Sequence, residues 1–279
     1  MLMLVHHSDS VRTVKWFVVF AVVFLAATHA CALEPVTALE DGFAVPFAGG
    51  TIESVLFYPG AESFTVNSFA CLAWCLPYGM ENLGVSTVHC GMNFGKMGVS
   101  CAFTASGFEL YGEDMEKLGV SYAPLKHFAV GARITRNAMR IKGFGQADAV
   151  SADVGAIVRP VEKVFLAVSC EDVLGVELGE SREPLDGAVR CAATWKLSDR
   201  FTFLSSLRKV RRFEPSFSTG FTAAIGDVLT AGVLGGNEPD RFEFLISALV
   251  ARIRCSYRGS YHQDLGMTHG FSLTWGYAR

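Results

Sequence analysis

The chain carries few charges and lacks the long apolar runs of helical membrane proteins. Of its 279 residues, 18% are charged and 51% are hydrophobic, and the formal net charge is −3. A near-neutral, slightly acidic chain gives no reason to expect a nucleic-acid partner. Beyond Ala27, no stretch approaches the roughly 18 uninterrupted apolar residues of a transmembrane helix. The apolar residues are therefore distributed over shorter elements.

Catalytic and metal-binding signatures are also missing. The sequence has no Gly-x-Ser-x-Gly elbow, no His-Glu-x-x-His pair and no phosphate-binding loop. His89 and His269 have no evident serine or carboxylate partner in the sequence, and Cys71 and Cys75 have no further metal ligands nearby. We therefore predict that the protein is not an enzyme and uses no cofactor and no metal.

The first 32 residues have the pattern of an export signal. Arg12 and Lys15 precede an apolar run of 12 residues, and Ala30-Cys31-Ala32 is the small-x-small pattern that signal peptidase cleaves. The run is shorter than the roughly 20 residues of a spanning helix. We predict that residues 1–32 are a signal peptide and that Leu33 is the first mature residue. A retained anchor and lipidation at Cys31 remain alternatives.

The mature chain would keep seven of the eight cysteines, an odd number that excludes complete pairing within the chain. Four of them, Cys90, Cys101, Cys191 and Cys255, fall on the apolar phase of predicted strands. Cysteine at such a position behaves as a small hydrophobic residue.

The C-terminal segment alternates between two kinds of side chain. Phe271, Leu273, Trp275 and Tyr277 are large and apolar or aromatic, whereas the residues between them are small or weakly polar. Neighbouring side chains of a strand point to opposite faces, so this segment has one apolar face. The same alternation recurs in several stretches, namely 88–94, 97–103, 150–158, 189–197 and 217–225. It is typical of transmembrane β-barrels, and a soluble β-sandwich is the alternative.

The predicted connections between strands alternate in length. The short ones are 95–96, 124–127, 159–163, 197–200 and 226–227, and the longer, polar ones are 106–115, 142–147, 172–186 and 209–215. Tight periplasmic turns and longer extracellular loops are characteristic of up-and-down barrels. We predict an all-β fold, a transmembrane up-and-down antiparallel β-barrel of about 14 strands (12–14).

The strand count depends on residues 241–258. The apolar residues lie at even positions up to Ala248 and at odd positions from Ile253 onward. A turn near Val250 gives 14 strands, whereas a bulge gives 13. Because single-chain bacterial barrels have even numbers of strands, we predict the turn.

Charged residues on the opposite phase are candidates for the barrel lumen, because a charge facing lipid costs about 2–4 kcal/mol at mid-membrane. They could bind the carboxylate of a ligand or select anions. Alternatively, they neutralise one another and fill a narrow lumen. The candidates are Arg252, Arg254, Arg258, Arg190, Lys196 and Asp153.

Several segments resemble the FadL-like outer-membrane proteins, in particular the PorV/PorQ branch and its uncharacterised spirochaetal relatives. The resemblance spans roughly residues 110–279, and its motifs follow one another in the order seen in that family. The segments are Tyr111–Ala123, Phe128–Arg133, Ile141–Gly145, Ala152–Pro160 and Asp264–Leu273.

The resemblance implies a 14-stranded barrel in the bacterial outer membrane that takes up hydrophobic or amphipathic small molecules. The alternatives are a docking platform for secreted or surface proteins and a surface antigen without transport. It also implies a plug in residues 33–70, with Gly49, Gly50 and Asn67 as plug candidates, followed by the barrel in 71–279. The expected partners are outer-membrane lipid, a hydrophobic small molecule and the barrel-assembly machinery that recognises the last strand.

Overall fold

The computed structural model describes residues 33–34, 52–65, 68–179, 183–237 and 241–276. The predicted signal peptide and the plug candidates Gly49, Gly50 and Asn67 lie outside the described residues. Among the described residues, no helix has the length and apolar character needed to cross a bilayer.

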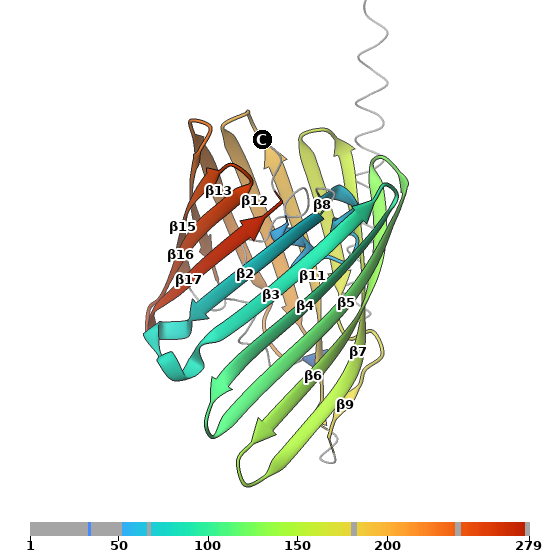
Figure 1. The fold of residues 1–279 in the computed structure, drawn as a ribbon, viewed down its shortest axis with the longest axis vertical. Coiled ribbons are helices and arrows are strands. Elements are labelled where there is room, and N and C mark those ends of the chain that lie inside the picture. The colour runs from blue at the N-terminus through green and yellow to red at the C-terminus, as the bar shows by residue number, and fades with distance from the viewer. Residues whose placement is uncertain (1–32, 35–51, 66–67, 180–182, 238–240, 277–279) are drawn as a thin grey trace, which may run out of the picture.

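The described chain forms a closed antiparallel β-barrel (Figure 1). The sheet contains 15 strands, of which the two-residue β1 (Leu33–Glu34) only adds to the margin of β11, so the closed wall has 14. Pairing of β8 with β11 and of β17 with β2 closes the wall. The 14 strands are β2 (Ser68–Leu76), β3 (Val85–Phe94), β4 (Met97–Phe108), β5 (Tyr111–Leu125), β6 (Phe128–Ile141), β7 (Gly145–Val161), β8 (Val164–Cys170), β11 (Asp186–Lys196), β12 (Phe201–Val210), β13 (Ser216–Ile225), β14 (Leu229–Gly236), β15 (Arg241–Val250), β16 (Ile253–His262) and β17 (Gly266–Trp275).

The predicted barrel and its 14 strands are confirmed. A single sheet that closes on itself excludes the sandwich, which needs two packed sheets. The ambiguous region contains a turn, because β15 ends at Val250 and β16 begins at Ile253. Ala251 in this turn has a φ of 56°, the left-handed conformation that tight hairpin turns use.

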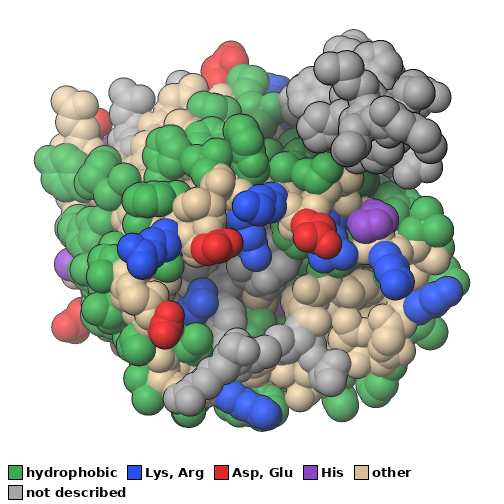
Figure 2. Space-filling model, turned by 90° about the horizontal axis from the view of Figure 1, so that it is seen from above, with side chains coloured by type: hydrophobic (Ala, Val, Ile, Leu, Met, Phe, Trp, Pro, Cys, Tyr) green, Lys and Arg blue, Asp and Glu red, His purple; other side chains and the backbone are tan. Residues whose placement is uncertain are grey.

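The outer face of the wall is mainly apolar, whereas the inner face carries more of the polar and small side chains. In β17, Phe271, Leu273 and Trp275 are exposed on the outside, whereas Thr274 between them is 0% exposed. Viewed along the barrel, apolar side chains lie around much of the periphery, and several charged side chains lie toward the middle (Figure 2). The alternation seen in the sequence therefore separates the outside of the barrel from its lumen.

The two ends of the barrel differ. The end that is uppermost in Figure 1 carries the turns 95–96, 126–127, 162–163, 197–200, 226–228 and 251–252, and we call it the short-turn end. The opposite end, the loop end, carries among others the connection 77–84 with the 3₁₀ helices η3 (Pro77–Gly79) and η4 (Glu81–Leu83). It also carries the connection 171–185 with β9 (Glu177–Leu178) and β10 (Glu183–Pro184).

Two predicted loops at the loop end are strands instead. Residues 106–115 contain only a tight turn between Phe108 and Tyr111, and residues 142–147 only one between Ile141 and Gly145. The hairpins of β4–β7 extend further than their neighbours at this end (Figure 1). The predicted loops were wrong because polar sequence was equated with irregular structure.

The polar sequence of these hairpins reflects a change of surroundings along the strands. On the outer face of β5 and β6, Leu118 and Ile134 are exposed apolar residues, and further toward the loop end Glu116 forms an exposed ion pair with Arg136 at 3.3 Å. A strand that leaves an apolar environment for water needs a charged outer face there. The pair marks the margin of the apolar band on this side of the barrel.

Residues 52–65 lie inside the barrel. They form the 3₁₀ helices η1 (Glu53–Leu56) and η2 (Ala61–Phe64), and we call them the inner segment. Ile52, Val55 and Tyr58 are almost completely buried and pack in one apolar cluster. The strand side chains of this cluster come from β2, β7, β8 and β11, namely Phe69, Ile157, Phe165, Ala167 and Ala192.

Candidate functional site

The lumen holds the candidate site, and one part of its wall is shaped for the inner segment. Four glycines on neighbouring strands form a seat. A Cβ at Gly131 would lie 2.2 Å from the backbone nitrogen of Gly60, and one at Gly155 would lie 2.6 Å from the carbonyl oxygen of Pro59. Side chains at these positions would displace the segment, so glycine permits the close approach of two backbones. The seat consists of Gly98 in β4, Gly119 in β5, Gly131 in β6 and Gly155 in β7.

Glu62 fastens η2 to this seat. Its side chain is 0% exposed, and its two carboxylate oxygens have different partners. Oε2 accepts the backbone N–H of Gly60 at 3.0 Å, and Oε1 accepts the hydroxyl of Ser100 in β4 at 2.8 Å. The hydroxyls of Ser63 and Ser121 add a second link, to β5, at 2.9 Å.

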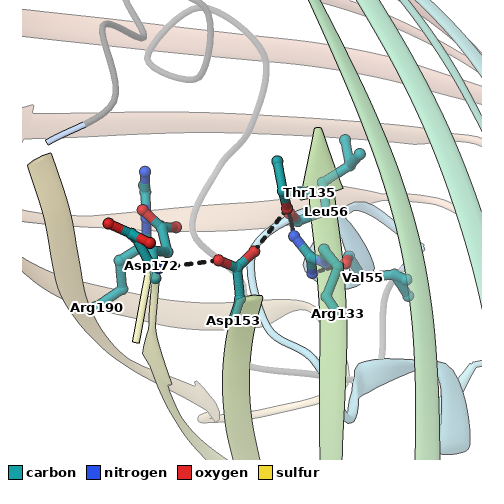
Figure 3. Close-up of polar contacts among 8 residues, drawn as sticks. Val55, Leu56, Arg133, Thr135, Asp153, Asp172 and Arg190 are labelled. Carbon is teal, nitrogen blue, oxygen red and sulfur yellow. Dashed lines mark hydrogen bonds and ion pairs between the residues drawn. The ribbon is translucent and has the colours of Figure 1, made fainter. Parts of the chain in front are cut away.

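Arg133 of β6 fastens η1. Its guanidinium donates from Nη1 to the carbonyl oxygen of Leu56 at 2.7 Å and from Nη2 to that of Val55 at 2.8 Å (Figure 3). These carbonyls end a short helix and have no helical partner, so the guanidinium satisfies them inside the barrel. Sequence reasoning missed Arg133, although it lies on the inner phase of β6.

Asp153 lies on the inner face of β7, beside Arg133 (Figure 3). Its Oδ2 accepts the hydroxyl of Thr135 at 3.0 Å and its Oδ1 accepts the backbone N–H of Asp172 at 3.0 Å. The carboxylate therefore joins β7 to β6 and to the start of the connection 171–185. A role in ligand binding stays a prediction.

Asp172 is a second buried carboxyl at this point. Burial raises its pKa, and the nearby Asp153 carboxylate raises it further, whereas the N–H of Val176 lowers it by hydrogen bonding. The side chain thus favours the protonated form more than a free aspartate does.

Arg190 of β11 links the wall to the inner segment. Its Nε donates to Oε1 of Glu171 at 2.7 Å, and both side chains are largely buried. The guanidinium carbon lies 5.3 Å from the centre of the Phe57 ring, a distance at which a cation is attracted to an aromatic face. Burial also raises the pKa of Tyr58 in this segment, so its phenol stays protonated.

The inner face of β12–β17 carries an ion pair and an apolar cluster. Arg258 of β16 donates through Nε to Oε2 of Glu243 in β15 at 3.0 Å, and its Nη2 bonds to the same oxygen. Both side chains are buried. Leu204 of β12 and Leu234 of β14 form an apolar cluster, with Leu245 of β15 packed against it.

The remaining predicted lumen residues do not join these clusters. Arg252 is exposed in the turn between β15 and β16, so it does not share a strand face with Arg254 and Arg258. Its assignment to the inner phase treated residue 252 as part of a strand, whereas the chain reverses there. Arg254 is half-buried near the short-turn end, and Lys196 is exposed at the end of β11. Of the six candidates, Asp153 and Arg190 lie close together through their partners Asp172 and Glu171, and Arg254 and Arg258 share β16.

The two histidines singled out in the sequence lie on opposite faces of the wall. His89 is buried on the inner face of β3, with its ring centre 4.9 Å from that of Phe69. His269 lies on the outer phase of β17, where its Nδ1 shares a 2.8 Å hydrogen bond with the hydroxyl of Tyr257.

No protein-family model matches the chain, and no curated protein shows significant sequence similarity to it. Solved structures do match in shape. A FadL homologue of Pseudomonas aeruginosa has a TM-score of 0.61 at 9% identity, with 89% of this chain and 100% of that chain covered. The chain has the FadL-type barrel fold.

Two further structures agree with this fold. The toluene transporter TodX of Pseudomonas putida has a TM-score of 0.59 at 10% identity, with 88% of this chain and 97% of that chain covered. The outer-membrane protein Omp33 of Acinetobacter baumannii has a TM-score of 0.51 at 9% identity, covering 76% of this chain and 98% of that chain. These identities concern the fold, and the predicted PorV/PorQ branch stays a prediction.

Proposed function

We propose that the protein lies in the bacterial outer membrane and admits hydrophobic or amphipathic small molecules through its lumen. The apolar outer face and the closed wall support a lipid environment, because a closed barrel leaves no unpaired strand edge. The neighbours in fold include a protein named as a toluene transporter. The alternating last strand, with Leu273 and Trp275 outward, suits recognition by the barrel-assembly machinery.

The short-turn end is assigned to the periplasm, following the general rule for bacterial barrels. The inner segment lies toward this end, because Phe64 packs edge-on against Phe165 at the start of β8 and lies 5.8 Å from the guanidinium of Arg159 near the end of β7. On this assignment the inner segment lies toward the periplasmic side of the lumen, where we propose that it acts as part of a plug. The plug as a whole, residues 33–70, stays a prediction.

The observation that supports the proposal is that the described contacts of the inner segment lie on one part of the lumen wall. The hydrogen bonds and apolar contacts of the inner segment described above lead to β2–β8 and β11. The wall of β12–β17 instead presents the Leu204 cluster and the Arg258–Glu243 pair. We infer that molecules pass along β12–β17 while the inner segment stays on its seat.

The paired charges indicate the class of molecule. Arg190 and Arg258 are each held by a buried carboxylate, so binding of a ligand carboxylate by either one would break an existing ion pair. This arrangement favours uncharged apolar molecules over fatty-acid anions. It also favours the interpretation that the inward charges neutralise one another.

Uptake into proteoliposomes tests the proposal. We expect vesicles with the protein to take up a labelled monoaromatic hydrocarbon at least several-fold faster than empty vesicles. The protein should increase the uptake rate of a labelled fatty acid by a smaller factor. Equal uptake by both kinds of vesicle would reject transport. Co-purification of an inert barrel with a secreted protein would then support the docking-platform alternative.

A further inference from the structure

Two cysteines face each other across the hairpin of β3 and β4. Cys90 and Cys101 are direct partners in the antiparallel register, on either side of the 95–96 turn. Their sulfur atoms lie 3.2 Å apart. Both are on the outer face, where Val88 and Phe103 of the same phase are also exposed.

The backbone already meets the requirements of a disulfide. Opposed residues of an antiparallel pair have Cα atoms about 4.5–5.5 Å apart, within the range of about 4.4–6.8 Å that disulfides span. A disulfide bond is about 2.05 Å long, so the sulfurs of Cys90 and Cys101 need to approach by roughly 1.2 Å. Rotation of the two side chains supplies such a shift without moving the strands.

Other cysteines of the chain are placed differently. Cys255 also lies on the outer face, but its neighbours across the strands are Ala248 and Leu273. Cys71 lies buried on the inner face, and its sulfur accepts the hydroxyl of Thr274 at 3.3 Å. The cross-strand arrangement therefore distinguishes Cys90 and Cys101 and provides a matched control in Cys255.

We propose that Cys90 and Cys101 form a disulfide in the exported protein, as a covalent link between β3 and β4. The oxidant is an oxidised thiol–disulfide oxidoreductase of the cell envelope. The thiolate of one cysteine attacks its disulfide and gives a mixed disulfide, and the thiolate of the second cysteine then displaces the oxidoreductase. The cysteines lose two protons and two electrons, and the oxidoreductase leaves as a dithiol.

The link forms before insertion, because both thiols face the apolar surroundings of the barrel afterwards. Export to an oxidising compartment is the part of the proposed function on which this inference rests, and uptake is not needed. The link encloses the 95–96 turn and fixes the register of the β3–β4 hairpin. Its loss should therefore weaken the barrel without abolishing the fold.

Peptide mapping of the native protein tests the proposal. Outer membranes are prepared in the presence of an alkylating agent, and the protein is denatured and digested without reductant. We expect a linked peptide pair joined through Cys90 and Cys101, two hydrogen masses lighter than the separate peptides, while Cys255 is alkylated. Alkylation of both Cys90 and Cys101 before any reductant is added would overturn the proposal.

Cysteine variants test whether the link stabilises the barrel. Cys90→Ser should leave Cys101 open to alkylation, whereas Cys255→Ser should keep the linked pair. Reductant should lower the temperature of heat-modified gel migration by about 5 °C more in the wild type and Cys255→Ser than in Cys90→Ser. An equal shift in all three proteins would refute the stabilising role. If Cys90→Ser fails to assemble, the mapping of the wild type decides the question of the link alone.

Discussion

The wall of β2–β8 and β11 differs from the wall of β12–β17 in what its inward side chains bind. The first wall directs Ser100, Arg133 and Arg190 to the inner segment and has a row of glycines where that segment touches it. The second wall pairs Arg258 with Glu243 on its own strands. One barrel thus has a sector whose inward side chains hold a segment in place and a sector with an ion pair between two of its own strands.

We propose that this difference lets the barrel hold the inner segment and still pass small molecules. A segment fixed on one side leaves the other side to line the path. On the proposed function, the Leu204 cluster, which is buried in this structure, would make that path apolar, and the nearby ion pair would limit its affinity for anions. The following changes test each sector separately.

The largest effect is expected from the ion pair of the β12–β17 wall. Glu243→Ala leaves the guanidinium of Arg258 buried without its carboxylate, which costs about 3–5 kcal/mol of unfolding free energy. The matched control is Glu116→Ala in the exposed Glu116–Arg136 pair, with an expected loss below about 1 kcal/mol. Urea unfolding in detergent micelles measures both. Equal losses would show that the buried pair has no special role.

A smaller effect is expected from the glycine seat. Gly131→Val places a side chain where the backbone of Gly60 lies and should cost about 1–3 kcal/mol. The inner segment should then become open to protease while the barrel wall stays resistant. The control is Gly235→Val, at an exposed position where a Cβ has no neighbour within 4 Å. If the inner segment of Gly131→Val stays protected from protease, the claim that the glycine seat holds it is wrong.

The smallest effect concerns pH. Because the pKa of Asp172 is raised in the fold, its ionised form is disfavoured there, and stability falls as the pH rises through that raised pKa. Asp172→Asn stays neutral, so it should unfold at a higher temperature than the wild type at pH 7 and at the same temperature below about pH 4. The control Asp148→Asn removes an exposed carboxylate of β7. A difference in unfolding temperature between Asp172→Asn and the wild type that grows toward low pH would contradict this prediction.

The sequence was informative where a pattern is local. The alternation around Leu273 and Trp275 predicted the outer face. The change of phase after Ala248, together with the even strand numbers of bacterial barrels, predicted a turn near Val250 and hence 14 strands. The same logic failed for the β4–β5 hairpin, because charged residues such as Glu113 and Asp114 lie within strand β5 and not in a loop.

The contacts of the lumen depend on pairs that are distant in sequence. Arg133 binds the carbonyls of Val55 and Leu56, and backbone carbonyls leave no signature in the sequence. The partner of Arg190 could be found only from the register of β8 against β11, which places Glu171 nearby. In an alternating strand, an inward glycine is expected as a small lumen-facing residue and equally as a contact site for another segment. Gly131 therefore gave no distinct signal in the sequence.

Cross-linking the inner segment to the wall tests the central claim, that molecules pass while this segment stays seated. Ser63→Cys and Ser121→Cys together place two thiols where the hydroxyls lie 2.9 Å apart, and oxidation then fixes η2 to β5. Hydrocarbon uptake into proteoliposomes is measured with and without reductant, beside the single variant Ser63→Cys. We expect the oxidised double variant to match the reduced one within about twofold. Uptake that stops on oxidation and returns with reductant would contradict the claim and show that the segment must leave its seat.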